Sequence, residues 1–103
     1  MDNIMDLLAK LKVAAKNFLD NGYARAEYHE FVRATDELAG AVKERIKAGR
    51  VVTFKGEDYH RDYEIKDGGD IISLSVDWLY FTDSEGRRCG FRMSRADTVS
   101  VEY

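Results

Sequence analysis

Residues 71–81, with the sequence IISLSVDWLYF, decide the fold of the second half of this chain. Apolar side chains alternate there with serine and aspartate, and a period of two residues predicts a strand that buries one face. The side chains predicted to be buried are Ile72, Leu74, Val76, Trp78 and Tyr80. Because Leu79 and Phe81 are also apolar, we expect that end of the strand to be covered on both sides or to lie at an interface. An unbroken strand of this length would span about 36 Å, so it should bend or be shared by two sheets.

A hairpin is predicted to follow this strand, because Asp83-Ser84-Glu85-Gly86 has Asp and Gly where a type I turn favours them. Placing Thr82 opposite Arg87 sets the register. The predicted pairs are Tyr80 with Cys89, Trp78 with Phe91 and Val76 with Met93 on one face, and Asp77 with Arg92 and Ser75 with Ser94 on the other. Matched partners on both faces favour this register.

The first half of the chain predicts two helices. Apolar residues spaced by three and four predict a helix that Asp2 or Asn3 caps and that ends at a left-handed Gly22. A second helix is predicted over residues 24–48, before Gly49. Its apolar positions form a heptad-like seam of Tyr28, Phe31, Thr35, Leu38, Val42 and Ile46. Since this helix is the longer one, part of the seam is expected to pack on the sheet or on a second subunit.

The chain of 103 residues is long enough for one domain, with a helical hairpin in residues 1–49 and antiparallel strands in residues 50–103. The strands are predicted at residues 51–55, 59–66, 71–81, 87–94 and 98–103. The predicted fold class is α+β, in which an N-terminal helical hairpin is followed by a five-stranded antiparallel sheet or a small SH3-like barrel.

The segment Arg95-Ala96-Asp97-Thr98-Val99 resembles the closing motif of Sm-like proteins, in which a basic residue and a glycine precede a final Val-rich strand. Ala96 stands where that family has glycine. The resemblance covers the C-terminal strands and implies a small SH3-like barrel. As a whole, this small, acidic, proline-free chain is similar to virus-encoded accessory proteins of bacteria, which include inhibitors of CRISPR complexes and proteins that sequester nucleotide second messengers.

Charge and hydropathy exclude several classes of function. The net charge is −3, and the acidic excess lies in residues 50–103, which argues against direct nucleic-acid binding through phosphate neutralisation. No apolar run approaches the roughly 18 residues of a membrane span. The start of the chain lacks the basic region of a signal peptide. We therefore expect a cytoplasmic protein without a membrane, in which the single cysteine, Cys89, is a small buried side chain.

No pattern of residues predicts catalysis or metal binding. His29 and His60 have no Cys or carboxylate at the spacing of metal ligands. The serines lack a nucleophile elbow and a base, and Gly68-Gly69 joins two strands instead of preceding a helix. We therefore expect no enzymatic activity, no metal and no cofactor.

Three sets of residues are candidates for binding. Arginines beside an aromatic residue suit a phosphate-bearing ligand or a protein hot spot, and they are Arg61, Arg88, Arg92 and Arg95 with Phe81. In the alternative, Arg92 pairs with Asp77 and the other arginines are solvated. Acidic residues that would dock on a basic partner are Glu57, Asp58, Asp62, Glu64, Asp67 and Asp70. The seam residues Tyr28, Phe31, Leu38, Val42 and Ile46 predict a homodimer or a higher oligomer.

The favoured function is a non-catalytic binding protein, a small phage-type inhibitor of a bacterial defence system that acts by protein contact, as anti-CRISPR proteins do. The first alternative is an oligomeric sponge that sequesters a phosphate-bearing nucleotide second messenger. The second alternative is a structural subunit that uses its helices for assembly alone.

Overall fold

The computed structural model of the chain describes residues 3–66, 71–83 and 85–102, and for residues 72–75 it describes the backbone alone. The predictions that concern Asp2, residues 67–70, Ser84 and Tyr103 lie outside the described residues. So do the side-chain pairing of Ser75 and the burial of Ile72 and Leu74.

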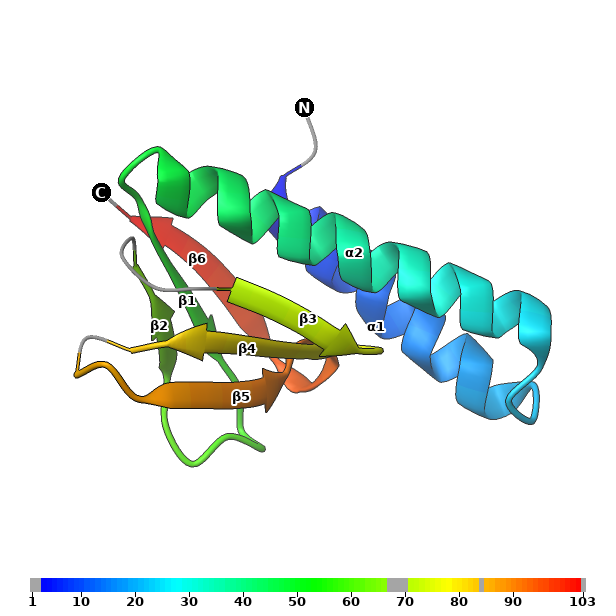
Figure 1. The fold of residues 1–103 in the computed structure, drawn as a ribbon. Helices are drawn as coiled ribbons and strands as arrows, with labels where there is room; N and C mark the ends of the chain where they lie inside the picture. The colour runs from blue at the N-terminus through cyan, green and yellow to red at the C-terminus, as the bar shows by residue number, and fades with distance from the viewer. Residues whose placement is uncertain (1–2, 67–70, 84, 103) are drawn as a thin grey trace.

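Two helices precede all the strands in the chain. The helices are α1 (Ile4–Asp20) and α2 (Arg25–Lys47). The strands are β1 (Val51–Lys55), β2 (Tyr63–Ile65), β3 (Ile71–Ser75), β4 (Trp78–Thr82), β5 (Arg88–Arg92) and β6 (Thr98–Glu102), with a 3₁₀ turn, η1 (Met93–Arg95), before β6. Figure 1 shows α1 and α2 side by side, covering one side of the strands and extending beyond them at the loop that joins the helices. The predicted α+β class, a helical hairpin followed by antiparallel strands, is confirmed.

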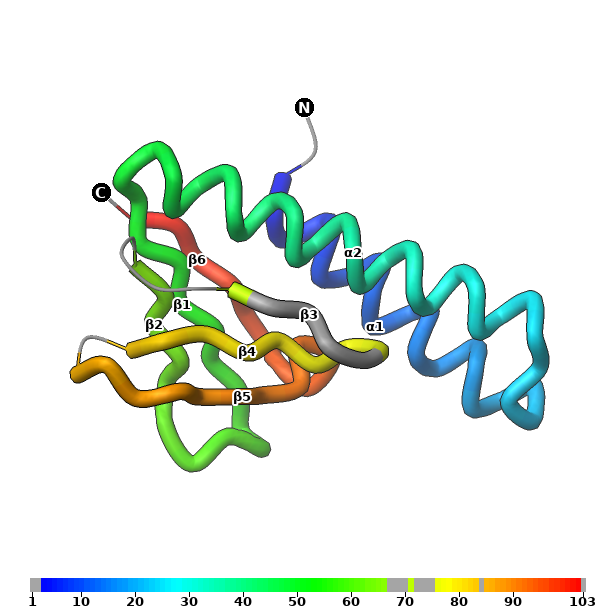
Figure 2. Tube along the Cα trace, in the orientation of Figure 1, coloured from blue at the N-terminus to red at the C-terminus, as the bar shows by residue number. Residues whose placement is uncertain are grey.

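The described strands form two three-stranded antiparallel sheets, in the orders β2-β1-β6 and β3-β4-β5. Figure 2 shows β4 and β5 running across the direction of β1 and β6. The two sheets pack through side chains such as Phe54 and Phe91, whose ring centroids are 4.9 Å apart. The last strand, β6, pairs with β1 along its whole length, from Val51 opposite Glu102 to Lys55 opposite Thr98.

The helix ends follow the predicted signals. Asn3 caps α1, and its side-chain oxygen accepts a hydrogen bond from the backbone N–H of Met5 at 3.0 Å. Gly22 is left-handed, with φ +65, as predicted. Within the described residues, no helix combines the length and the apolar character that crossing a membrane requires.

The prediction of one strand over residues 71–81 is wrong. β3 and β4 pair with each other, with Ile71 opposite Phe81 and Ser75 opposite Trp78, so the chain reverses at residues 76–77. Asp77 makes this reversal with φ +61, a left-handed conformation that Asp tolerates better than most side chains.

A set of buried bonds around Asp77 holds this turn. Its backbone N–H donates to Thr35 Oγ1 of α2 at 3.1 Å, and the Thr35 hydroxyl itself donates to the carbonyl oxygen of Phe31. The carboxylate of Asp77, with a side chain only 3% exposed, accepts from Arg92 Nε at 2.9 Å and from the Ser94 hydroxyl. The turn before β4 is therefore attached both to α2 and to the residues at and just after the end of β5.

The predicted register between β4 and β5 is wrong by one residue. Thr82 lies opposite Arg88 instead of Arg87. The N–H of Asp83 donates to the carbonyl oxygen of Arg87 at 2.8 Å, and Gly86 has φ +80. The loop therefore includes Arg87 in addition to the residues of the predicted turn.

A shift of one residue exchanges the two faces of a strand. Trp78 and Tyr80, which were predicted to be buried, lie with Arg88 and Arg92 on the outer face of the sheet β3-β4-β5. The residues that instead enter the core from this hairpin are Leu79, Phe81, Cys89 and Phe91. This exchange decides which side chains the sheet offers to a ligand.

Candidate functional site

Most of the predicted seam on α2 is buried inside the chain itself. Phe31 and Ile46 are each 6% exposed, and Leu38 and Val42 are 0% exposed, because they belong to the core between the helices and the sheets. Tyr28 is 43% exposed and is the one seam residue of these five that a partner could reach. Four of the five seam residues therefore pack inside this chain, which is one of the two outcomes expected for the seam, and the homodimer or higher oligomer stays a prediction.

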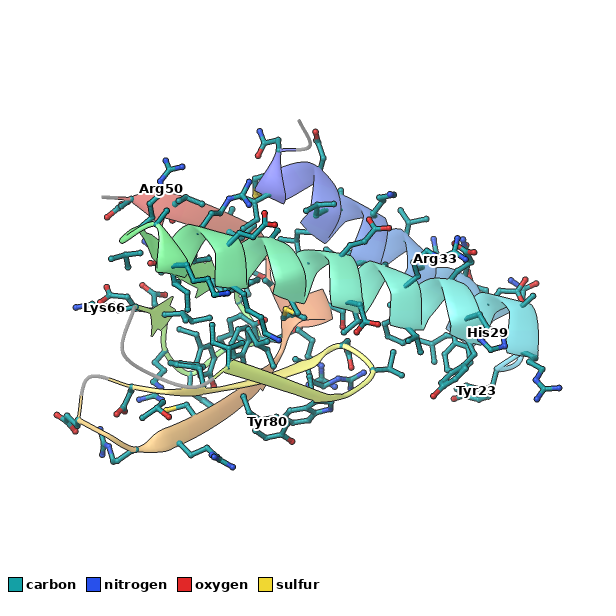
Figure 3. All side chains as sticks on the ribbon, turned by 45° about the horizontal axis from the view of Figure 1, so that its top comes forward. Tyr23, His29, Arg33, Arg50, Lys66 and Tyr80 are labelled. Atoms are coloured by element: carbon teal, nitrogen blue, oxygen red, sulfur yellow. The ribbon has the colours of Figure 1, made fainter. Side chains whose placement is uncertain are left out.

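The free end of the helical hairpin carries a cluster of apolar side chains, Phe18, Leu19, Tyr23 and Tyr28, which we call the hairpin-end cluster. Leu19 is 59% exposed and Tyr23 is 67% exposed. The Phe18 ring lies at the centre, with its centroid 5.1 Å from that of Tyr23 and 5.8 Å from that of Tyr28. Figure 3 shows Tyr23 and His29 at this end of the hairpin, away from Arg50 and Lys66 at the other end of the molecule.

The end of α1 explains how Tyr23 is positioned. The Tyr23 N–H donates to the carbonyl oxygen of Phe18, and the Gly22 N–H donates to that of Leu19, which is the bond pattern of a Schellman motif. Such motifs bring the residue after the left-handed position into contact with the last turn of the helix. Tyr23 itself is also left-handed, with φ +64, which is a strained conformation for a bulky side chain.

A second aromatic site lies on the outer face of the sheet β3-β4-β5. The rings of Trp78 and Tyr80 are half-buried and nearly parallel, with centroids 5.9 Å apart and planes 15° apart. The Tyr80 ring, labelled in Figure 3, lies over Gly90 of β5, where an added Cβ would be 2.5 Å from Tyr80 Cε1. We call Trp78, Tyr80 and Gly90 the sheet-face platform.

Two of the predicted arginines flank this platform. Arg92 lies opposite Trp78, and Arg88 lies opposite Thr82, on either side of Gly90. Arg92 forms the ion pair with Asp77, as the alternative interpretation of that residue predicted. Arg88 is exposed and makes no ion pair with any residue that the structure describes.

The remaining residues of the arginine set lie elsewhere. Phe81 is only 3% exposed, so its prediction as an accessible aromatic residue is wrong, and the register shift is the reason. Arg61 donates from Nη2 to Cys89 Sγ at 2.9 Å, and this hydrogen bond raises the pKa of the Arg61 guanidinium. Arg95 is exposed on η1. Cys89 is buried, as predicted.

The acidic set is partly neutralised by neighbouring lysines. Lys55 Nζ lies 3.8 Å from Asp62 Oδ2, and Lys66 Nζ lies 2.9 Å from Glu64 Oε1. The other two described members of this set, Glu57 and Asp58, are exposed in the turn after β1. The described acidic residues therefore alternate with positive charge instead of forming a uniformly negative surface.

Tyr59 and Asp83 have perturbed pKa values, and both groups make hydrogen bonds to the backbone of the β4-β5 hairpin. Burial raises the pKa of the Tyr59 phenol, whose hydroxyl donates to the carbonyl oxygen of Arg92. The backbone N–H of Arg87, followed by that of Glu85, lowers the pKa of the Asp83 carboxyl. Among the described residues, no group of three or more His, Cys, Asp or Glu side chains is arranged to hold a metal ion.

The sequence did not predict the sheet-face platform, and of the hairpin-end cluster it predicted only Tyr28 as a partner-facing residue. Trp78 and Tyr80 were assigned to the core because the register was displaced, and Gly90 opposite Tyr80 is the signal that identifies their true face. Tyr23 was missed because it lies between the helices, where periodicity assigns no face. Comparisons with known protein families, with curated proteins and with solved structures find no match to this chain.

Proposed function

We propose that this chain is a non-catalytic cytoplasmic binding protein that acts by protein contact, with the hairpin-end cluster as its contact surface. The observation that supports this proposal most directly is the conformation of Tyr23, which combines φ +64 with 67% exposure. Strained backbone in an exposed aromatic residue is a feature that binding sites retain and that stability alone does not favour.

The backbone conformation of Tyr23 has a cost in folding free energy. A left-handed backbone costs a bulky residue about 1 to 3 kcal/mol, and a ring that is mostly exposed recovers only part of this by contact with Phe18. Tyrosine is enriched among the residues that dominate protein interfaces. Because the Schellman motif and Phe18 hold the ring before a partner arrives, little side-chain entropy is lost on binding.

The narrower form of the proposal is a phage-type inhibitor of a bacterial defence system. Its support is the small acidic chain together with the helical hairpin and antiparallel sheets. Two crossing three-stranded sheets with a 3₁₀ turn before the last strand support the resemblance to small SH3-like barrels. The alternative of a structural subunit would place a second copy at the hairpin-end cluster, and native mass spectrometry separates the two by giving the subunit count.

The experiment is a comparison of partner capture from bacterial lysate by wild type and by two variants, Tyr23→Gly and Leu19→Ser. The matched control is Val13→Ser, because Val13 is also on α1 and is 59% exposed, as Leu19 is. We expect the captured protein to be lost with both cluster variants and retained with the control, while the melting temperatures stay close to wild type. Equal capture by all four proteins would remove the hairpin-end cluster from consideration as the contact surface.

A further inference from the structure

We propose that the sheet-face platform binds a nucleotide, with the base stacked on the rings of Trp78 and Tyr80 and the phosphate bound by Arg88. This goes beyond the proposed function, because it uses another surface of the molecule and another class of ligand. It keeps Arg88 from the predicted arginine set and replaces Phe81 by Trp78 and Tyr80 as the aromatic residues of the nucleotide-binding alternative.

The orientation of the Trp78 and Tyr80 rings suits a planar ligand. The planes of Trp78 and Tyr80 differ by 15° and their ring centroids are 5.9 Å apart, so the two rings are stacked with nearly parallel faces. The outer face of such a half-buried parallel pair accepts a further planar ring by stacking, and this contact tolerates any base because every base has a π face. The rings of the hairpin-end cluster meet at 51° to 74° and offer no such surface.

Gly90 allows the backbone of β5 to support the Tyr80 ring. With no side chain at this position, the Tyr80 ring lies directly against β5, where a Cβ would come within 2.5 Å and 2.6 Å of two ring carbons. The platform is therefore supported by the backbone of the sheet before a ligand arrives. A surface that is already in its binding conformation loses less free energy to ordering when it binds.

Arg88 supplies a positive charge beside the platform. Arg88 lies two residues from Gly90 along β5 and on the same face, so its guanidinium can reach a ligand seated on Tyr80. An arginine without a carboxylate partner is suited to bind phosphate through two parallel hydrogen bonds. The charge of Arg92 is already matched by the buried carboxylate of Asp77, so Arg88 carries the open positive charge at the platform.

The balance of charge favours a free nucleotide over a nucleic-acid strand. A strand gains most of its affinity from the neutralisation of several phosphates, whereas this face offers one open arginine. The net charge of −3, with its acidic excess in residues 50–103, would repel the remaining phosphates of a strand. One base with one short phosphate chain, as in a nucleoside 5′-diphosphate, is what the platform and Arg88 together can match.

The chain provides its own probe for this site. Trp78 is the single tryptophan, so the tryptophan emission of the protein reports on the platform alone. We would titrate wild type with the four ribonucleoside 5′-diphosphates, the matching nucleosides, ribose 5-phosphate and a single-stranded oligonucleotide. We expect saturable quenching by at least one diphosphate, weaker binding of its nucleoside by about tenfold or more, and no quenching by ribose 5-phosphate.

Three variants assign the binding to the named residues. Arg88→Ala should weaken the diphosphate by about tenfold and leave the nucleoside unchanged, because it removes the phosphate contact alone. Gly90→Ala should weaken both, because its Cβ displaces Tyr80. Arg87→Ala is the control, since this neighbouring arginine is paired with Asp83 and Glu85 in the turn, and it should bind as wild type does.

Several results would overturn the proposal. They are the absence of saturable quenching by every diphosphate at millimolar concentration, equal affinity in wild type and Arg88→Ala, and much tighter, steeply salt-dependent binding of the oligonucleotide. The Arg88→Ala variant changes an exposed side chain, so it keeps the test valid if Gly90→Ala fails to fold. Tyr23→Gly should bind nucleotide as wild type does, which separates this proposal from the contact function of the hairpin-end cluster.

Discussion

The hairpin-end cluster and the sheet-face platform are both exposed aromatic sites, yet they differ in geometry, charge and support. At the hairpin end, Tyr23 and Tyr28 meet Phe18 at steep angles and their edges point in several directions. On the sheet, Trp78 and Tyr80 are nearly parallel and lie near an open arginine. The number of aromatic residues at the surface therefore says less about the ligand than the orientation of their rings. Rings at steep angles suit an irregular protein partner, and parallel rings suit a planar ligand.

The two sites also depend on the core to different degrees. The platform lies on a sheet whose other face buries Leu79 and Phe91, at 0% and 3% exposure. The hairpin-end cluster lies beyond the sheets, and its loop is held by helix-end hydrogen bonds and by the contact of Tyr23 with Phe18. Changes at the platform should therefore alter global stability as well as binding, whereas changes at the hairpin end should alter binding with little effect on stability.

The largest effect is expected from Asp77→Ala, which removes the buried support of the turn before the platform. The variant leaves Arg92 and Ser94 without their acceptor and places Ala at φ +61. We expect the free energy of unfolding to fall by about 2 to 3 kcal/mol, below the full cost for a buried ion pair because the Arg92 side chain is 36% exposed. Urea denaturation followed by circular dichroism measures this loss.

The matched control for that prediction is Asp77→Asn, which keeps a side chain that tolerates the left-handed conformation and accepts hydrogen bonds. Its loss should be closer to 1 kcal/mol. If Asp77→Ala unfolds at the same urea concentration as wild type, the platform does not depend on this turn.

Two glycine substitutions are expected to have opposite signs. Gly90→Ala should destabilise the protein by about 1 to 2 kcal/mol and change the tryptophan emission, since its Cβ collides with the Tyr80 ring. Gly40→Ala should stabilise by about 0.5 to 1 kcal/mol, because Gly40 is inside α2 and an added Cβ meets no atom within 4 Å. Thermal melting and emission spectra of both variants check the pair, and a loss of stability in both would contradict it.

The stability of the protein is expected to depend on pH through Tyr59, which lies against β5 at the edge of the platform sheet. Because burial holds its pKa above the ordinary value of 10.0, the folded protein keeps the proton at a pH where the unfolded chain has lost it. Near neutral pH the titration of this group does not change the stability, and the stability falls as the pH rises above about 10. Urea midpoints measured between about pH 8 and about pH 11 should decline more steeply in wild type than in Tyr59→Phe.

Tyr59→Phe has a second consequence that serves as a check. The variant loses the hydrogen bond to the Arg92 carbonyl oxygen, so at neutral pH it should be less stable by about 1 kcal/mol. Parallel pH curves for the two proteins would show that the Tyr59 hydroxyl is not buried on this edge.

The smallest effect on stability is expected at the hairpin end. Tyr23→Gly loses the contact with Phe18 but relieves the left-handed strain, and glycine adds an entropy cost of its own. These contributions nearly cancel, so the free energy of unfolding should change by less than about 0.5 kcal/mol. A loss above 1 kcal/mol in urea denaturation would show that Tyr23 is a structural residue and would weaken the comparison.

The sequence predicted the parts of the fold whose signals are local. Asn3 and Gly22 marked the ends of α1. The strand predicted at residues 51–55 has the same bounds as β1. The reversal at residues 76–77 was missed because a two-residue turn leaves the alternation of apolar and polar residues intact on both sides. The register was missed because Arg87 belongs to the loop, and its residue type does not show whether it ends the loop or begins the strand.

The candidate site could be predicted only in part, for the same physical reasons. Arg88 and Arg92 were correctly placed on one outer face, and the pairing of Arg92 with Asp77 was one of two interpretations. Their aromatic neighbours depended on the register, which was displaced by one residue. The exposure of Tyr23 depends on how far the helices extend past the sheets, which is a tertiary property that no local pattern encodes.

The pairing of β6 with β1 has a consequence for the order in which the molecule assembles. Contacts within the helical hairpin join residues that are near in sequence and can form quickly, whereas β1 must wait for a partner from the far end of the described chain. During synthesis the helices therefore leave the ribosome before the sheet that covers them can close. Until β6 arrives, β1 keeps an unpaired strand edge, and this interval is when the nascent chain is most open to association with other strands.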